Sequence, residues 1–100
     1  MVQGTTPTHT FYLPFSADAL KEVMVIYAQN NEEIFHKDTA ECTIGENQIS
    51  LKLTQEETFL FKPSVNVQIQ IRVLKTDGEA YVSRIMHVSV AKCLNCEVMS

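Results

Sequence analysis

The segment Ser64–Lys75 constrains the fold most strongly, because apolar and polar residues alternate along it. Successive side chains of a β-strand point to opposite faces of the sheet, so this period of two predicts a strand with one buried and one exposed face. The apolar face comprises Val65, Val67, Ile69, Ile71 and Val73, and the polar face comprises Asn66, Gln68, Gln70 and Arg72. Asp77-Gly78 follows as a tight hairpin turn.

Six further segments are predicted to be strands. Val, Ile and Thr make up 26 of the 100 residues, and their branched side chains fit a pleated, half-buried surface. The six segments are Thr8–Phe15, Glu22–Gln29, Glu33–Lys37, Glu41–Ile44, Gln48–Leu53 and Ala80–Val90. Pro7 and Pro14 predict that the first of them lies at a sheet edge, because proline cannot donate to a ladder. In the last, Ala80, Val82, Met86, Val88 and Val90 are predicted to share one face, while Arg84 fits a bulge or a strand end.

Turn and cap signals separate these strands. Asn30-Asn31-Glu32 and Gly45-Glu46-Asn47 are turn signals, since asparagine and glycine tolerate left-handed backbone angles. Thr54 and Glu57 have the spacing of a capping box, which predicts a short helical turn near residues 55–60. Seven short strands with such turns predict a single all-β domain over residues 1–100, folded as a two-sheet antiparallel sandwich.

Composition excludes several classes of protein. The chain carries eight basic and twelve acidic residues, and the basic ones are scattered rather than clustered, which argues against nucleic-acid binding. No apolar run is long enough to span a membrane, and the first 20 residues lack the basic start of a secretory signal. The odd cysteine count indicates reduced thiols, as in a cytosolic setting.

Candidate catalytic and metal-binding groups do not assemble into a local motif. Cys93 and Cys96 have the spacing of half a zinc site, but a closed site needs two more ligands. Ser83 and His87 would lie about 13 Å apart on a strand, beyond the reach of a nucleophile and its base. His36 and Asp38 would share a face about 7 Å apart, as at a solvated polar edge. We therefore expect no enzyme, no cofactor and no metal.

Two surfaces are candidates for binding a partner. One is the polar stripe Asn66, Gln68, Gln70 and Arg72, which otherwise is an ordinary solvated sheet face. The other is the apolar surplus, formed by Leu94, Val98 and Met99 and by Val23–Ala28, which is apolar on both faces. Carbohydrate binding is an alternative that would require exposed aromatic rings, for which Tyr12, Tyr27 and Tyr81 are the candidates.

Several stretches together resemble a known group of proteins. They are Gly4–Phe15, Ile49–Thr58, Val67–Val73, Asp77-Gly78 before Ser83, and Leu94–Val98. The chain resembles small prophage-encoded proteins of Gram-positive gut bacteria, which are similar to the N-terminal domain of upper baseplate proteins in siphophage tails. The resemblance implies an immunoglobulin-like sandwich and a virion or tail structural protein.

Such proteins work by assembly. The resemblance implies that one surface docks a tail or baseplate neighbour, often in symmetric copies, so the expected partners are other phage structural proteins and further copies of the chain. It implies no catalytic residues. The expected location is the bacterial cytoplasm during synthesis and the virion afterwards. A carbohydrate-binding or accessory module of an enzyme remains the alternative function.

Overall fold

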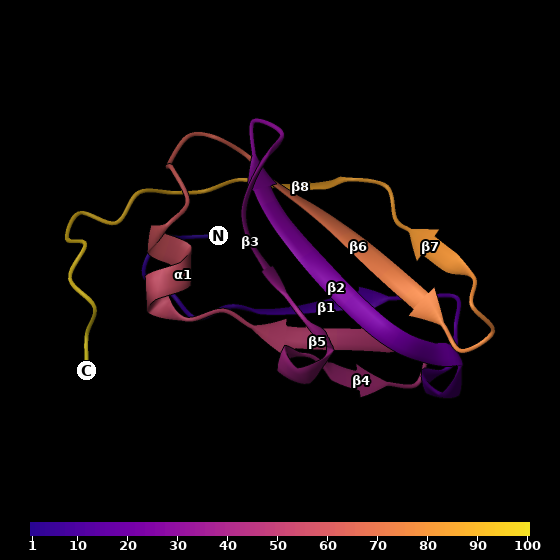
Figure 1. The fold of residues 1–100 in the computed structure, drawn as a ribbon. Coiled ribbons are helices and arrows are strands. Elements are labelled where there is room, and N and C mark those ends of the chain that lie inside the picture. The colour runs from indigo at the N-terminus through magenta and orange to yellow at the C-terminus, as the bar shows by residue number, and fades with distance from the viewer.

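Two antiparallel β-sheets packed against each other form the protein, as the computed structural model of residues 1–100 shows (Figure 1). The strands are β1 (Thr8–Tyr12), β2 (Leu20–Gln29), β3 (Glu32–Lys37), β4 (Thr43–Gly45), β5 (Gln48–Lys52), β6 (Val67–Lys75), β7 (Ala80–Val82) and β8 (Met86–Val88). One short helix, α1 (Gln55–Phe59), and two 3₁₀ turns, Ala17–Ala19 and Thr39–Glu41, complete the chain. The predicted all-β antiparallel sandwich with one helical turn is confirmed.

The small sheet has the strand order β1-β5-β4, and the large sheet has the order β3-β2-β6, with both β7 and β8 on the far side of β6. The longest pairing joins β2 to β6, from Leu20 opposite Lys75 to Ala28 opposite Gln68. β1 is an edge strand, as the prolines beside it predict. The large sheet is therefore organised around two long central strands, β2 and β6, that run side by side (Figure 1).

The core lies between the two sheets and follows the alternation seen in the sequence. β6 contributes every second residue, and β2 and β5 do the same, because their inward side chains meet in the middle of the sandwich. The buried hydrophobic residues are Leu13, Val23, Val25, Tyr27, Ile49, Leu51, Leu53, Phe61, Val67, Ile69, Ile71, Val73 and Val90. Burial of this apolar surface is the main force that holds the two sheets together.

Helix α1 starts at the predicted capping box. The hydroxyl of Thr54 accepts a hydrogen bond from the backbone N–H of Glu57, and the Glu57 carboxylate accepts one from the N–H of Thr54. These two bonds satisfy backbone groups that the first turn leaves without partners. No helix in the structure has the length and apolar character needed to cross a membrane.

The N-terminal residues Met1–Gln3 lie beside Ala91, which follows β8. Val2 forms a parallel bridge with Ala91, the Gln3 N–H donates to the carbonyl of Ala91 at 3.0 Å, and the Ala91 N–H donates to the carbonyl of Met1 at 2.8 Å. The buried Gln3 side chain adds bonds to the carbonyl of Phe61 and the N–H of Cys93. The N-terminal segment is thus bonded to the chain that follows β8 before it enters β1 of the small sheet.

The prediction of one continuous strand over Ala80–Val90 is wrong, because the structure has two short strands there, β7 and β8. The structure divides it at Ser83–Ile85, so that Val82 lies opposite Arg72 on the outer side of the large sheet, while Met86 lies opposite Ile69 on the inner side. Ala80 and Val82 therefore do not share a face with Met86, Val88 and Val90. The irregular segment shifts the alternation, as a bulge does.

Other predicted boundaries differ by a few residues. β1 ends at Tyr12 rather than Phe15, because Pro14 has no N–H for the ladder. The strand predicted to start at Glu41 starts at Thr43, because the preceding residues Thr39–Glu41 form a 3₁₀ turn. In this turn, the Thr39 hydroxyl accepts a hydrogen bond from the Val23 N–H at 2.9 Å and donates one to the Val23 carbonyl at 3.2 Å. Thr39 thus occupies the side of β2 that β3 leaves free beyond its last residue.

Candidate interaction surfaces

The outer face of the large sheet carries the predicted polar stripe, but beside it lies an apolar row. The register places Met24 opposite Arg72, Ile26 opposite Gln70, and Ala28 opposite Gln68. The apolar outer side chains of β2 are only partly buried, because no second layer covers this face. The outer face is therefore mixed in character.

Two amides of the stripe are used within the chain. The Gln68 side chain donates to the Asn31 side chain at 2.9 Å and accepts from the Asn31 N–H at 2.7 Å, which fixes the β2–β3 turn. The Gln70 side chain donates to the carbonyl of Ser83 at 3.0 Å. Asn66 and Arg72 are exposed. The structure thus separates the four stripe residues into two that support neighbouring segments and two that face solvent.

A hollow of about 430 Å³ lies on this face where β2, β6 and β7 end. Met24 and Val82 contribute apolar walls, and Glu22, Asp38 and Arg72 contribute charged groups. Its lining therefore combines apolar side chains with two carboxylates and one guanidinium.

The second predicted surface, the C-terminal tail (residues 92–100), holds its apolar side chains outward. Leu94 is 96% exposed, Met99 is 81% exposed and Val98 is 45% exposed. The tail is nevertheless attached to the sandwich, because the Gln55 side chain donates to the Met99 carbonyl and accepts from the Met99 N–H, both at 2.9 Å. Val98 lies over a second hollow that Lys52 and Gln55 help to line.

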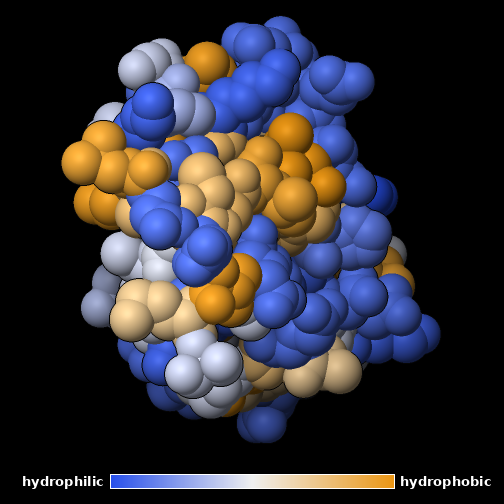
Figure 2. All heavy atoms as spheres, turned by 90° about the vertical axis from the view of Figure 1, so that its left-hand side faces the viewer, coloured by the Kyte–Doolittle hydropathy of each residue, from blue (hydrophilic) through white to orange (hydrophobic).

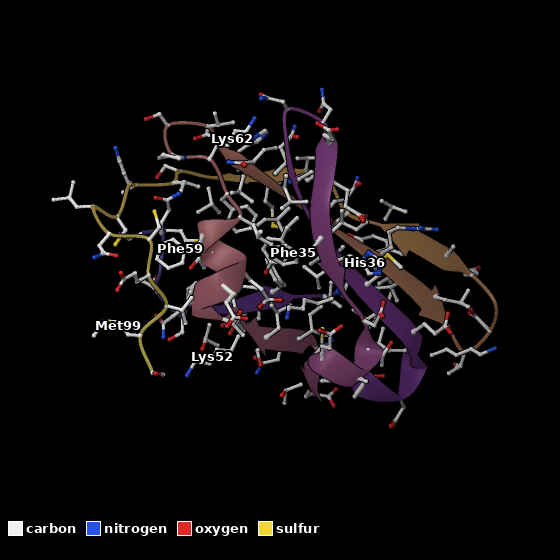
Figure 3. All side chains as sticks on the ribbon, turned by 60° about the vertical axis from the view of Figure 1, so that its left-hand side comes forward. Phe35, His36, Lys52, Phe59, Lys62 and Met99 are labelled. Carbon is white, nitrogen blue, oxygen red and sulfur yellow. The ribbon has the colours of Figure 1, made fainter.

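The tail lies at the same end of the sandwich as α1 and the N-terminus (Figure 1). Figure 3 shows Met99 on the tail and Phe59 on α1 at this end. Figure 2 looks onto it and shows apolar side chains gathered among hydrophilic ones. Leu60 and Val2, from segments that adjoin α1, are also exposed. We call Val2, Leu60, Leu94, Val98 and Met99 the apolar end.

A cluster of polar side chains lies between the sheets near α1. The Lys37 ammonium pairs with the carboxylates of Glu57 and Glu41, and its side chain is only 9% exposed. Burial opposes the charge of Lys37, but the hydrogen bonds and negative charges of both glutamates outweigh burial and raise the pKa of Lys37. Burial likewise disfavours the charge of Glu57, yet Lys37 and Thr54 lower the pKa of that carboxyl.

His9 and Tyr27 form the other half of this cluster. The His9 Nδ1 and the Tyr27 hydroxyl are 2.8 Å apart, and the two rings are stacked. Burial and the nearby N-terminal ammonium lower the pKa of His9. Burial and the charges of Cys42 and Glu57 raise the pKa of Tyr27. Both groups are therefore neutral at physiological pH, and their hydrogen bond crosses the core from the small sheet to the large one.

The other candidates for chemistry lie apart. The Ser83 hydroxyl accepts a hydrogen bond from the Ile71 N–H and donates one to the Arg84 carbonyl. Both bonds stabilise the irregular segment Ser83–Ile85. His87 lies opposite Gln68 on the outer face. The side chains of His36 and Asp38 contact each other, with Nε2 and Oδ1 3.5 Å apart, and Glu33 Oε2 lies 3.3 Å from His36 Nδ1.

All three cysteines are free. Burial and the charge of Glu41 raise the pKa of Cys42, which lowers its thiolate fraction. Cys96 is exposed on the tail, and the Cys93 thiol donates to the Asn95 carbonyl at 3.2 Å. No group of three His, Cys, Asp or Glu side chains is placed to hold one metal ion.

Sequence reasoning missed the buried polar residues Gln3, Gln29, Lys37 and Thr58. Two of them had a signal, because Gln29 continues the inward series of β2 and Lys37 follows Phe35 by two residues. Comparison with protein-family models, with curated proteins and with solved structures finds no match. The surfaces and the fold are therefore the basis for a functional proposal.

Proposed function

We propose that the chain is a non-enzymatic structural or assembly protein of a phage virion, in the tail or baseplate, and that it acts through protein–protein contacts. The observation that carries the proposal is the tail, which is hydrogen-bonded to the sandwich yet presents Leu94 and Met99 to solvent. Large contiguous apolar patches on the surface of a small protein mark partner interfaces.

The resemblance to siphophage baseplate domains indicates the kind of partner. It favours another structural protein of the same particle, seated on the apolar end. The immunoglobulin-like character of the sandwich is part of the same proposal. Arg72 and Asn66, the two stripe residues that face solvent, offer a second contact on the outer face of the large sheet.

Purified particles test the proposal. A bacterium that carries the gene in a prophage is induced, its virions are purified on a density gradient, and their proteins are quantified by mass spectrometry. The chain is expected in a fixed copy number per particle, and deletion of its gene is expected to reduce complete tails. Its absence from particles, together with normal tails after deletion, would refute the proposal.

Two variants locate the contact. The double substitution Leu94→Ser and Met99→Ser removes the exposed apolar groups, and we expect loss of incorporation with an unchanged fold. Val82→Ser tests the outer face of the large sheet instead, because Val82 is also an exposed apolar residue and lies opposite Arg72. If only Val82→Ser abolishes incorporation, the contact lies on that face and the role of the tail is wrong.

One observation keeps carbohydrate binding as a second candidate. Tyr27 is buried and Tyr81 is half-buried against Phe15, but Tyr12 is 80% exposed on the small sheet. An exposed aromatic ring is a surface on which a sugar stacks. A glycan array with the wild-type chain and Tyr12→Ala tests this, and an array without hits eliminates it.

A further inference from the structure

The sandwich has four sheet edges, two in each sheet. β1 and β4 border the small sheet, and β3 and the β7–β8 pair border the large sheet. An edge strand presents unpaired N–H and C=O groups that can pair with a strand of another chain. Proteins block such edges with charged side chains, proline, bulges or very short strands. Each edge can be judged by these features.

Three of the edges are blocked. β3 contains Glu32, Glu33, His36 and the inward-pointing Lys37, and its register with β2 is irregular. β4 is only three residues long. β7 and β8 are equally short, and the Ser83–Ile85 bulge separates them. Beyond β8, Val2 already pairs with Ala91.

Within β1 none of these protections is present, because Pro7 and Pro14 lie outside the strand at its two ends. The strand Thr-His-Thr-Phe-Tyr is five residues long, contains no Asp, Glu, Lys, Arg or Pro, and pairs with β5 in unbroken register. Its histidine, His9, points into the core toward Tyr27. Thr, Phe and Tyr are strand-forming residues. Of all the edges, β1 is therefore the one that is built to accept a further strand.

The hydrogen bonds at both ends of β1 show which groups are free. The Leu53 N–H donates to the Pro7 carbonyl at 3.0 Å, and the Leu13 N–H donates to the Asn47 carbonyl at 2.9 Å. Hydrogen-bonded pairs alternate along an antiparallel ladder, so the odd-numbered residues of β1 bond to β5. The N–H and C=O groups of Thr8, Thr10 and Tyr12 consequently point away from β5, toward the open side.

We propose that a second copy of this chain occupies this edge. β1 would pair antiparallel with β1 of the partner about a two-fold axis at Thr10, which joins two three-stranded sheets into one continuous sheet. In this register Thr10 faces the partner's Thr10, Thr8 faces the partner's Tyr12, and His9 faces the partner's Phe11. All the free backbone groups of the strand then find partners.

The sequence of β1 is complementary to itself in this arrangement. No acid or base of the strand faces another across the axis, and threonine–threonine and aromatic–threonine pairs stabilise antiparallel strands. Tyr12, which is 80% exposed in the single chain, would be covered at the outer face, and the half-buried Phe11 at the inner face. Self-pairing therefore satisfies the backbone and covers the exposed ring without placing like charges together.

The contact is small, so the dimer is expected to be weak and concentration-dependent. Sedimentation of the purified chain up to about 1 mM is expected to show a monomer–dimer equilibrium. Amide exchange measured by NMR should show protection of Thr8, Thr10 and Tyr12 that rises with concentration, whereas His9 and Phe11 are protected throughout. This alternation is specific to pairing along β1.

Two charge variants complete the test, which uses the chain alone and does not depend on the proposed function. Thr10→Lys places like charges together at the axis and should raise the dissociation constant by roughly fivefold or more. Thr43→Lys adds the same charge in the same cross-strand row, but on β4, and should leave it unchanged. A strict monomer at the highest concentration, rising protection elsewhere, or an unaffected Thr10→Lys dimer would each overturn the proposal.

Discussion

Lys37 on β3 forms an ion pair with Glu57 on α1, and this contact ties the edge of the large sheet to the helix that follows the small sheet. Glu41 is the second partner of the same ammonium, at 3.4 Å. Glu57 also closes the capping box with Thr54. One buried cation thus links β3, the Thr39–Glu41 turn and the start of α1.

Replacing Lys37 should destabilise the fold. In Lys37→Met the partly buried Glu57 keeps its charge but loses its partner, and we expect the free energy of unfolding to fall by roughly 2 kcal/mol, less than for a fully buried pair. Urea denaturation measures the change. Lys62→Met is the matched control, because Lys62 is exposed and its ammonium makes no ion pair. Equal stability of the two variants would contradict the role given to Lys37.

His9 should make the protein less stable in mild acid. Burial and the N-terminal ammonium lower its pKa in the folded state below the ordinary 6.5, so the unfolded chain binds the proton more readily. Stability is full above pH 6.5 and falls as the pH drops toward the folded-state pKa. Thermal unfolding at several pH values should show a weaker loss for His9→Gln, which does not titrate. An equal loss of stability in acid for His9→Gln and the wild-type chain would contradict this prediction.

Gly4 should be intolerant of a side chain. Its φ is +81°, and a Cβ there would lie 2.7 Å from Cζ of Phe59, so both the backbone and the ring would have to adjust. We expect Gly4→Ala to cost roughly 2 kcal/mol, measured by thermal denaturation. Gly78→Ala separates the two causes, because Gly78 has φ of +89° but open space around it. Its cost should be nearer to about 1 kcal/mol.

Gln29 should be essential for the loop before β6. Its buried side chain donates to the carbonyls of Lys62 and Val65 and accepts from the Lys62 N–H at 2.8 Å. Gln29→Leu keeps a similar volume but leaves these backbone groups without hydrogen-bond partners. We expect the free energy of unfolding, measured by urea denaturation, to fall by roughly 3 kcal/mol. Gln55→Leu removes two bonds at the surface and should cost less than about 0.5 kcal/mol. A small effect at Gln29 would show that water replaces its bonds.

The parts of the fold that follow from local patterns could be predicted from sequence. The alternation of Val67–Val73 and the capping box at Thr54 depend only on nearby residues, and both appear as expected. The face of Val82 could not be predicted, because the shift at Ser83 depends on bonds to β6, which lies earlier in the chain. The bonds of two stripe residues could not be predicted for the same reason, since Gln68 and Gln70 bond to Asn31 and Ser83 on other segments.

The bridge between Val2 and Ala91 has a consequence for how the chain folds during synthesis. Gln3 has no partner for its backbone or its buried side chain until Phe61, Ala91 and Cys93 have left the ribosome. β2 likewise cannot form its longest pairing until β6 has been synthesised. Contacts so distant in sequence slow folding, because a long loop must close before they form. The large sheet of the nascent chain therefore cannot form until β6 has emerged, and the N-terminal segment cannot be fixed until Ala91 has.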